Sequence, residues 1–117
     1  MRHNPRKDRN HNEIKELFEG MGLTVWDAAG GHGGIPDLIV GYGCVSALVE
    51  VKDGKKAPSE RRLTSSQNDY FVKMQGANFV VKNVDEAIAV ANWIIELDAL
   101  CNSNYIEVPL AATEYFD

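Results

Sequence analysis

Two short apolar runs separated by glycines constrain the fold of this 117-residue chain more than any other feature. The runs Leu38–Val40 and Val45–Val49 flank the segment Gly41-Tyr42-Gly43-Cys44. Apolar runs broken by a glycine-rich turn are typical of the two strands of a β-hairpin. We therefore predict an antiparallel pair of strands joined by the two-residue turn Gly43-Cys44.

This hairpin would gather charged side chains at its open end. With a two-residue turn, Asp37 lies opposite Glu50, and their Cβ atoms are roughly 5 Å apart on one face of the sheet. Lys52 shares that face because strand side chains alternate with a period of two. A register change of one residue would place the two carboxylates on opposite faces.

The pair Asp37 and Glu50 has two interpretations. Like charges at this range destabilise a sheet unless a cation offsets them, and carboxylate oxygens suit Mg²⁺ or Mn²⁺. A divalent metal site is the functional interpretation. Alternatively, Asp37 caps the strand entry after Pro36, while Glu50 and Lys52 form an exposed cross-strand ion pair.

Helical and strand patterns continue on both sides of the hairpin. Apolar periodicity and capping signals predict helices over about 9–20, 64–75 and 83–100, and strands over about 23–26 and 77–81. Elements in this order predict a single α/β domain with a mixed sheet. We expect residues 1–11 to form a mobile basic arm, which either contacts phosphates or is simply solvated. Residues 102–117 could pair with a second subunit or pack on their own core.

The composition is that of an ordinary soluble globular domain, with 44% hydrophobic and 25% charged residues. No apolar run reaches the length of a membrane span, so we expect no membrane association and an intracellular, cytoplasmic protein. The net charge is −5, yet residues 1–62 carry ten Lys and Arg against nine Asp and Glu, whereas residues 63–117 carry two against eight. A basic surface for nucleic acid is therefore compatible with the acidic total.

The cysteines and histidines do not form a metal motif. Cys44 and Cys101 lie far apart without CxxC spacing, which indicates neither a zinc site nor a disulfide framework, and we expect both to be buried. His3, His11 and His32 also lack metal-ligand spacing, and the first two fall in the predicted arm.

Four motifs follow one another along the chain: Asn12-Glu13, the glycine-rich Gly30–Asp37, Glu50-Val51-Lys52 and Leu63–Gln67. As an ordered set they resemble the VRR-NUC family of the PD-(D/E)xK nuclease superfamily over about residues 12–81. The resemblance implies a restriction-endonuclease-like αβββαβ core with a mixed central sheet, to which this chain adds a C-terminal helix. It also implies a Mg²⁺- or Mn²⁺-dependent endonuclease that hydrolyses DNA phosphodiester bonds.

The resemblance also implies roles for individual residues. The implied catalytic residues are Asp37, Glu50, Lys52 and Gln67. The implied metal ligands are Asp37, Glu50, the Val51 carbonyl and Glu13. Glu13 could equally be a solvated helix charge. Gln67 has a rival role as the last residue of the capping box that begins at Thr64. Both roles can hold in part, but we expect that one amide cannot orient toward both groups at once, and we favour the site.

Contacts with DNA are expected from a cationic loop and a histidine. The candidate residues are Lys55, Lys56, Arg61, Arg62 and His32. The alternative is a solvated loop and a histidine without a role. Members of the resembled family often carry an arginine shortly before the glycine-rich loop, whereas this chain has Trp26-Asp27-Ala28-Ala29, so a phosphate contact from that position is not expected.

Stand-alone VRR-NUC domains of this length resemble virus and phage proteins and dimeric Holliday-junction resolvases. The implied partners are therefore branched DNA and a second copy of the chain, because two sites related by a twofold axis would cut a junction symmetrically. A viral protein of this kind would act in the host cytoplasm. The alternatives are a noncatalytic branched-DNA-binding module that keeps the nuclease fold, and a regulatory partner that binds through its acidic second half.

Overall fold

The structure is a computed structural model that describes residues 9–103 except residues 30 and 32. Its elements are α1 (His11–Gly20), β1 (Thr24–Asp27), β2 (Leu38–Tyr42), β3 (Val45–Val51), the 3₁₀ turn η1 (Pro58–Glu60), α2 (Ser65–Lys73), β4 (Asn78–Val81) and α3 (Val84–Ser103). The mixed α/β class and the predicted order of helices and strands are confirmed. No helix in the described part of the chain is long and apolar enough to span a membrane.

The four strands form one mixed sheet in the order β1-β2-β3-β4. The pairs β1–β2 and β2–β3 are antiparallel, whereas β3 and β4 are parallel. Leu38 lies opposite Val49 and Tyr42 lies opposite Val45, which confirms the two-residue turn. Gly43, the first turn residue, has a φ of 57°, the left-handed conformation that glycine adopts without a steric penalty.

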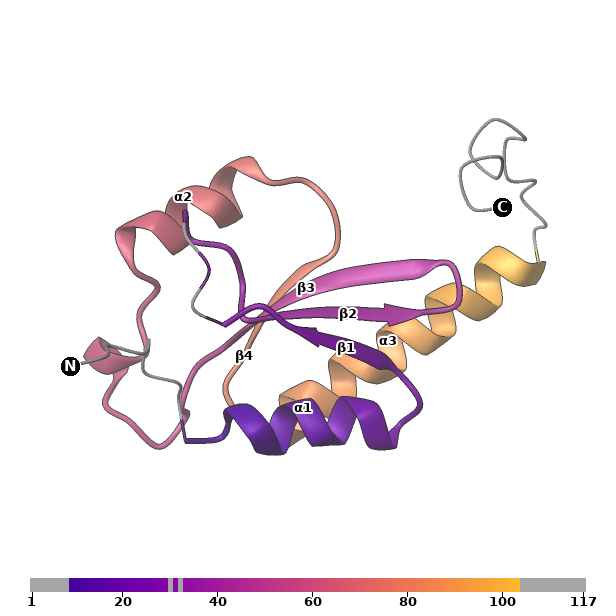
Figure 1. Cartoon of the computed structure of the whole chain (residues 1–117), viewed down its shortest axis with the longest axis horizontal. Coiled ribbons are helices and arrows are strands. Elements are labelled where there is room, and N and C mark those ends of the chain that lie inside the picture. Colours follow the sequence, from indigo (N-terminus) through magenta and orange to yellow (C-terminus); the bar gives the residue numbers. More distant parts are fainter. Residues whose placement is uncertain (1–8, 30, 32, 104–117) are drawn as a thin grey trace.

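The helices cover the two faces of the sheet unequally. Figure 1 shows α1 and α3 packed along one face, with α2 on the other side of the sheet, away from the hairpin turn. Alternate residues of β2 and β3 fill the core against α1 and α3. The largest fully buried apolar side chains are Phe18, Ile14, Leu38, Ile94, Val40, Val49, Val51 and Val81. Helix α2 buries none of its residues, so much of its face of the sheet stays open.

The beginning of the described chain is folded, which corrects the prediction of a mobile arm extending to residue 11. His11 is the first residue of α1 and is only 2% exposed, and its Nε2 lies 3.0 Å from Asp27 Oδ2. The Arg9 Nε lies 2.7 Å from the buried Asp53 carboxylate. A buried carboxylate is stabilised by a cation at this range, so Arg9 belongs to the folded domain. The predictions for residues 1–8, His32 and the tail from residue 104 lie outside the described residues.

Cys44 is exposed, not buried as predicted, because it occupies the hairpin turn. Its backbone N–H donates to Asp98 Oδ1 of α3 at 3.0 Å, which places the turn against the end of that helix. The thiol of Cys101 and the carboxylate of Asp98 raise the pKa of the Cys44 thiol to about 11. Sequence spacing gave no sign that these two cysteines are neighbours.

Candidate active site

Strand β3 directs two charged side chains onto the face of the sheet that carries α2. Val49 and Val51 point into the core, so strand alternation directs Glu50 and Lys52 to the opposite face. Glu50 is 2% exposed and Lys52 is 8% exposed, which is unusual for charged residues. The confirmed register, continued by one residue beyond β2, sets Asp37 opposite Glu50.

Gln67 connects Glu50 of β3 and Lys52, the residue after that strand, to α2. Its Nε2 donates to Glu50 Oε2 at 2.7 Å, and its Oε1 accepts from Lys52 Nζ at 2.9 Å. The same Oε1 accepts from the backbone N–H of Thr64, which completes the capping box. The expectation that one amide cannot orient toward both groups at once is therefore wrong, because a carbonyl oxygen can accept two hydrogen bonds while the NH₂ group donates elsewhere.

Glu50 is the least satisfied carboxylate of this cluster. Its Oε2 accepts from Gln67 and lies 3.5 Å from Lys52 Nζ, but its Oε1 is buried and has no hydrogen-bond partner. Burial and the nearby Asp37 carboxylate raise the pKa of Glu50 to about 7, against the opposing effect of Lys52. A single ammonium group thus compensates the two adjacent carboxylates only in part.

The Val51 carbonyl lies in a gap in the hydrogen-bond ladder. The amide of Lys52 bonds to β4, so its neighbour Val51 faces β2. The residue opposite Val51 in the continued register is Pro36, which has no N–H to donate. The Val51 N–H instead donates to Asp37 Oδ2 at 2.9 Å, which fixes that carboxylate beside the carbonyl.

These donors fit a small hard divalent cation. Asp37, Glu50 and the Val51 carbonyl offer oxygen ligands only, and Mg²⁺ is typically held by one or two carboxylates while it keeps several waters. The buried, unpartnered Oε1 of Glu50 is the position that such an ion would satisfy. Burying a carboxylate oxygen without a partner carries a large desolvation penalty, which a bound cation would offset.

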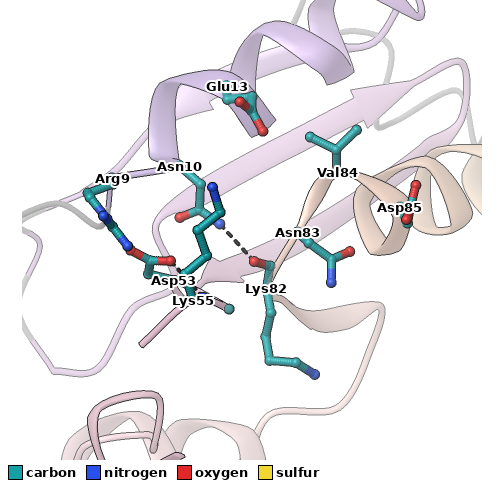
Figure 2. Close-up of a pocket in the computed structure, with 10 residues that line it drawn as sticks. Arg9, Asn10, Glu13, Asp53, Lys55, Lys82, Asn83, Val84 and Asp85 are labelled. Atoms are coloured by element: carbon teal, nitrogen blue, oxygen red, sulfur yellow. Dashed lines mark hydrogen bonds and ion pairs between the residues drawn. The ribbon is translucent and has the colours of Figure 1, made fainter. Parts of the chain in front are cut away.

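Glu13 lies in a different place from these donors. It lines a pocket of about 540 Å³ between the start of α1, the loop after β3 and the start of α3. Figure 2 shows Glu13 and Lys55 on two sides of this pocket, with Arg9 beside Asp53 at its edge. Among the described residues, no three or more His, Cys, Asp or Glu side chains gather as possible ligands of one metal ion, so Glu13 does not join Asp37 and Glu50 in this structure.

The predicted DNA contacts lie on the β3–β4 side of the site. Lys55 lines the pocket of Figure 2, and Lys56 is close enough to the Asp53 carboxylate to help lower its pKa, after the larger effect of the hydrogen bond from Arg9. Arg61 lies near Glu86 at the start of α3, and Arg62 is exposed in the same loop. All four cations belong to the segment between β3 and α2.

Two residues outside the predicted catalytic and binding set support the site. Asn10 donates through Nδ2 to the carbonyls of Lys52 and Lys82, at 3.0 Å and 2.8 Å, and so ties together the ends of β3 and β4. Gly34 has a φ of 78° and lies so close to α2 that a Cβ there would overlap the Ser66 carbonyl. The paired glycines of the loop signalled an unusual backbone, whereas nothing in the sequence distinguished Asn10.

The cluster therefore combines two neighbouring carboxylates, a backbone carbonyl opposite a proline, a buried ammonium group and a bridging amide at one end of the sheet. Comparison of the chain with protein-family models, curated proteins and solved structures gave no match.

Proposed function

We propose that this chain is a metal-dependent endonuclease that hydrolyses DNA phosphodiester bonds. The observation that carries the proposal is the buried carboxylate of Glu50, which lies beside Asp37 and leaves Oε1 without a partner. Two adjacent carboxylates with one unsatisfied oxygen are unfavourable as a purely structural feature. A bound divalent cation would turn the same arrangement into a favourable one.

The side chains have distinct roles in this proposal. Asp37, Glu50 and the Val51 carbonyl would hold Mg²⁺ or Mn²⁺. The ion, when bound, supplies Lewis acidity toward the scissile phosphate and lowers the pKa of the attacking water. Lys52 would orient that water or offset the negative charge that develops on the phosphorane.

Gln67 would act as a positioning residue. Its amide holds the carboxylate of Glu50 and the ammonium group of Lys52 in one fixed relation, because it bonds to both. A positive charge that is already oriented loses little free energy to reorganisation when the transition state forms. The hydrogen bond from Val51 N–H to Asp37 gives the other carboxylate a similar constraint.

The order of elements and the motif resemblance support a more specific version of the proposal. Helix, three strands, helix and strand is the order of the PD-(D/E)xK core, and the motif residues follow the VRR-NUC pattern. We propose on this basis a restriction-endonuclease-like core, a branched-DNA substrate such as a Holliday junction, and a homodimer that cuts both strands.

The test is cleavage of an end-labelled four-way DNA junction, with linear duplex as a parallel substrate and Mg²⁺ or Mn²⁺ present. Asp37→Asn and Lys52→Ala should each lower the cleavage rate by about 100-fold or more. Asn at position 37 can still accept the Val51 N–H, so the fold is kept. The control is Asp69→Asn, which removes an exposed carboxylate on α2 that pairs only with Lys73 in the described structure and should leave the rate unchanged.

The outcomes separate the parts of the proposal. Symmetric paired nicks that disappear in both variants support a junction-specific nuclease with its site here. Equal cutting of linear duplex removes the junction specificity and keeps the nuclease. Cleavage retained by Asp37→Asn would overturn the site, and binding of branched DNA without cutting under either ion would favour the noncatalytic module.

A further inference from the structure

An exposed tryptophan lies on the open face of the sheet, next to the candidate site. Trp26 of the edge strand β1 is 72% exposed, although Val25 beside it packs against the core. In the sheet register Trp26 lies opposite Ile39, which in turn lies opposite Leu48. Directly opposed residues share a face, so these three side chains form an apolar row on the side of the sheet that carries α2.

This row is adjacent to the two carboxylates. Asp37 precedes Ile39 by two residues and Glu50 follows Leu48 by two, so both point to the same face one row further along the strands. Trp26 and Asp37 are diagonal neighbours on adjoining strands, a relation that separates Cα atoms by roughly 7–8 Å. That distance corresponds to about two nucleotide steps of a stacked DNA strand.

Charged side chains are distributed asymmetrically around the two carboxylates. The cations Lys55, Lys82 and Arg61 lie by the ends of β3 and β4, whereas Trp26 lies on β1 at the far side of the carboxylates. The positions that adjoin the apolar row on its other side are uncharged: Thr24, Gly41 and Ser46. A polyanionic strand that crosses the sheet would therefore meet cations on one side of the cut and an apolar, aromatic surface on the other.

We infer that Trp26 is a substrate-binding residue that stacks on an unpaired DNA base next to the scissile phosphate. The inference rests on the proposed nuclease function and adds a substrate class: DNA with an unstacked base within about two nucleotides of the cut. Bases inside a duplex have both faces covered, so only an unpaired or splayed base presents a face to a protein ring. A tryptophan that is 72% exposed can offer such a ring without rearrangement.

The chain has two tryptophans, so the fluorescence of Trp93 can serve as the control for that of Trp26. Trp93 lies on α3 and packs edge-to-face on Phe79, with ring centroids 5.3 Å apart. A Trp93→Phe variant leaves Trp26 as the only tryptophan, and a Trp26→Phe variant leaves Trp93. Both are made in the Asp37→Asn background so that DNA is not cut, and both are titrated with an oligodeoxythymidylate of about eight nucleotides and with a duplex of equal length.

Stacking predicts that the single strand quenches Trp26 emission, that the duplex does so much less, and that Trp93 emission is unchanged by either. Trp26→Ala should weaken single-strand binding by about 5- to 150-fold, which is the usual contribution of one stacked base. Trp26→Phe should retain part of the affinity and Trp26→Leu should lose it, because both keep an apolar side chain and only Phe keeps a ring. Circular dichroism confirms that each variant is folded.

Two results would overturn the inference. One is unchanged Trp26 emission together with wild-type affinity of Trp26→Ala for the single strand. The other is a Trp26 emission shift that depends on protein concentration without DNA, which would make this face a contact between two copies of the chain. Quenching of Trp26 emission without cleavage by the wild-type protein would support stacking and refute the nuclease. Cleavage by the wild-type protein together with the first of these two results would refute stacking and keep the nuclease.

Discussion

Replacement of Glu50 by glutamine should make the metal-free protein more stable at alkaline pH while it abolishes cleavage. The folded state raises the pKa of Glu50 from 4.5 to about 7. A group with a raised carboxyl pKa binds its proton more tightly in the folded state, so its contribution to stability is present below the unfolded pKa and is lost as pH rises through about 7. Glutamine is neutral throughout and keeps an oxygen that can accept from Gln67 and Lys52.

The magnitude follows from the two pKa values. One unit of pKa shift corresponds to about 1.4 kcal/mol, so the full shift is about 3 kcal/mol. Between about pH 5 and about pH 8, the wild-type protein should therefore lose about 2 to 3 kcal/mol of unfolding free energy relative to Glu50→Gln. At about pH 5 the two proteins should differ little, because Glu50 is then mostly protonated.

Urea denaturation in EDTA at the two pH values measures this difference. Glu16→Gln, which removes an exposed carboxylate of α1, is the control and should follow the wild-type pH dependence. Added Mg²⁺ at about 100 times its dissociation constant should stabilise the wild type by about 2.7 kcal/mol and leave Glu50→Gln nearly unchanged. If the unfolding free energies of the wild type and Glu50→Gln differ by the same amount across this pH range, Glu50 is not an uncompensated buried carboxylate.

Three further predictions concern the surroundings of the site. Gly34→Ala should destabilise the protein by about 1–3 kcal/mol more than Gly33→Ala in thermal denaturation. Both positions have positive φ, but only at Gly34 would the added methyl group overlap α2. Equal effects of the two substitutions would contradict the close approach of Gly34 to α2. Asn10→Ala should lower the unfolding free energy by about 1–3 kcal/mol, since the carbonyls of Lys52 and Lys82 lose their donor. Replacement of the exposed Asn12 by alanine should leave the unfolding free energy unchanged. An unchanged unfolding free energy in Asn10→Ala would show that water replaces the amide. Cys44, with a thiol pKa of about 11, should be alkylated roughly 10- to 100-fold more slowly than a free cysteine at about pH 8, and the rate should rise toward pH 11; a plateau near pH 9 would refute the shift.

Local patterns predicted the parts of the site that depend on short-range geometry. The register of the hairpin followed from the two-residue turn, and with it the opposition of Asp37 and Glu50. The capping box at Thr64 followed from residue spacing alone. Both rest on interactions between residues close in sequence or on strand alternation, which the sequence encodes directly.

Relations between separate elements were the part that sequence could not supply. The rotation of α1 about its axis decides that His11 is buried against Asp27 while Glu13 lines the pocket of Figure 2, and nothing in the helix pattern specifies that angle relative to the sheet. The double role of Gln67 depends on how α2 is laid over β3. The contact between the hairpin turn and the end of α3, in which the Cys44 N–H bonds to Asp98, is likewise a long-range packing result.

The weak attachment of α2 to the sheet determines the fraction of molecules in which the candidate site is complete. This helix has no buried residue and is joined to the sheet by Gln67 at its first turn and by the 2.7 Å hydrogen bond from Tyr70 to Asn78. Segments with little buried apolar area open at a free energy well below that of global unfolding. The docked fraction of α2, and not the integrity of the sheet, would then set how many molecules have an assembled Glu50–Lys52–Gln67 network. Mild denaturant should therefore abolish the proposed cleavage activity while amides of β2 and β3 are still protected from hydrogen exchange.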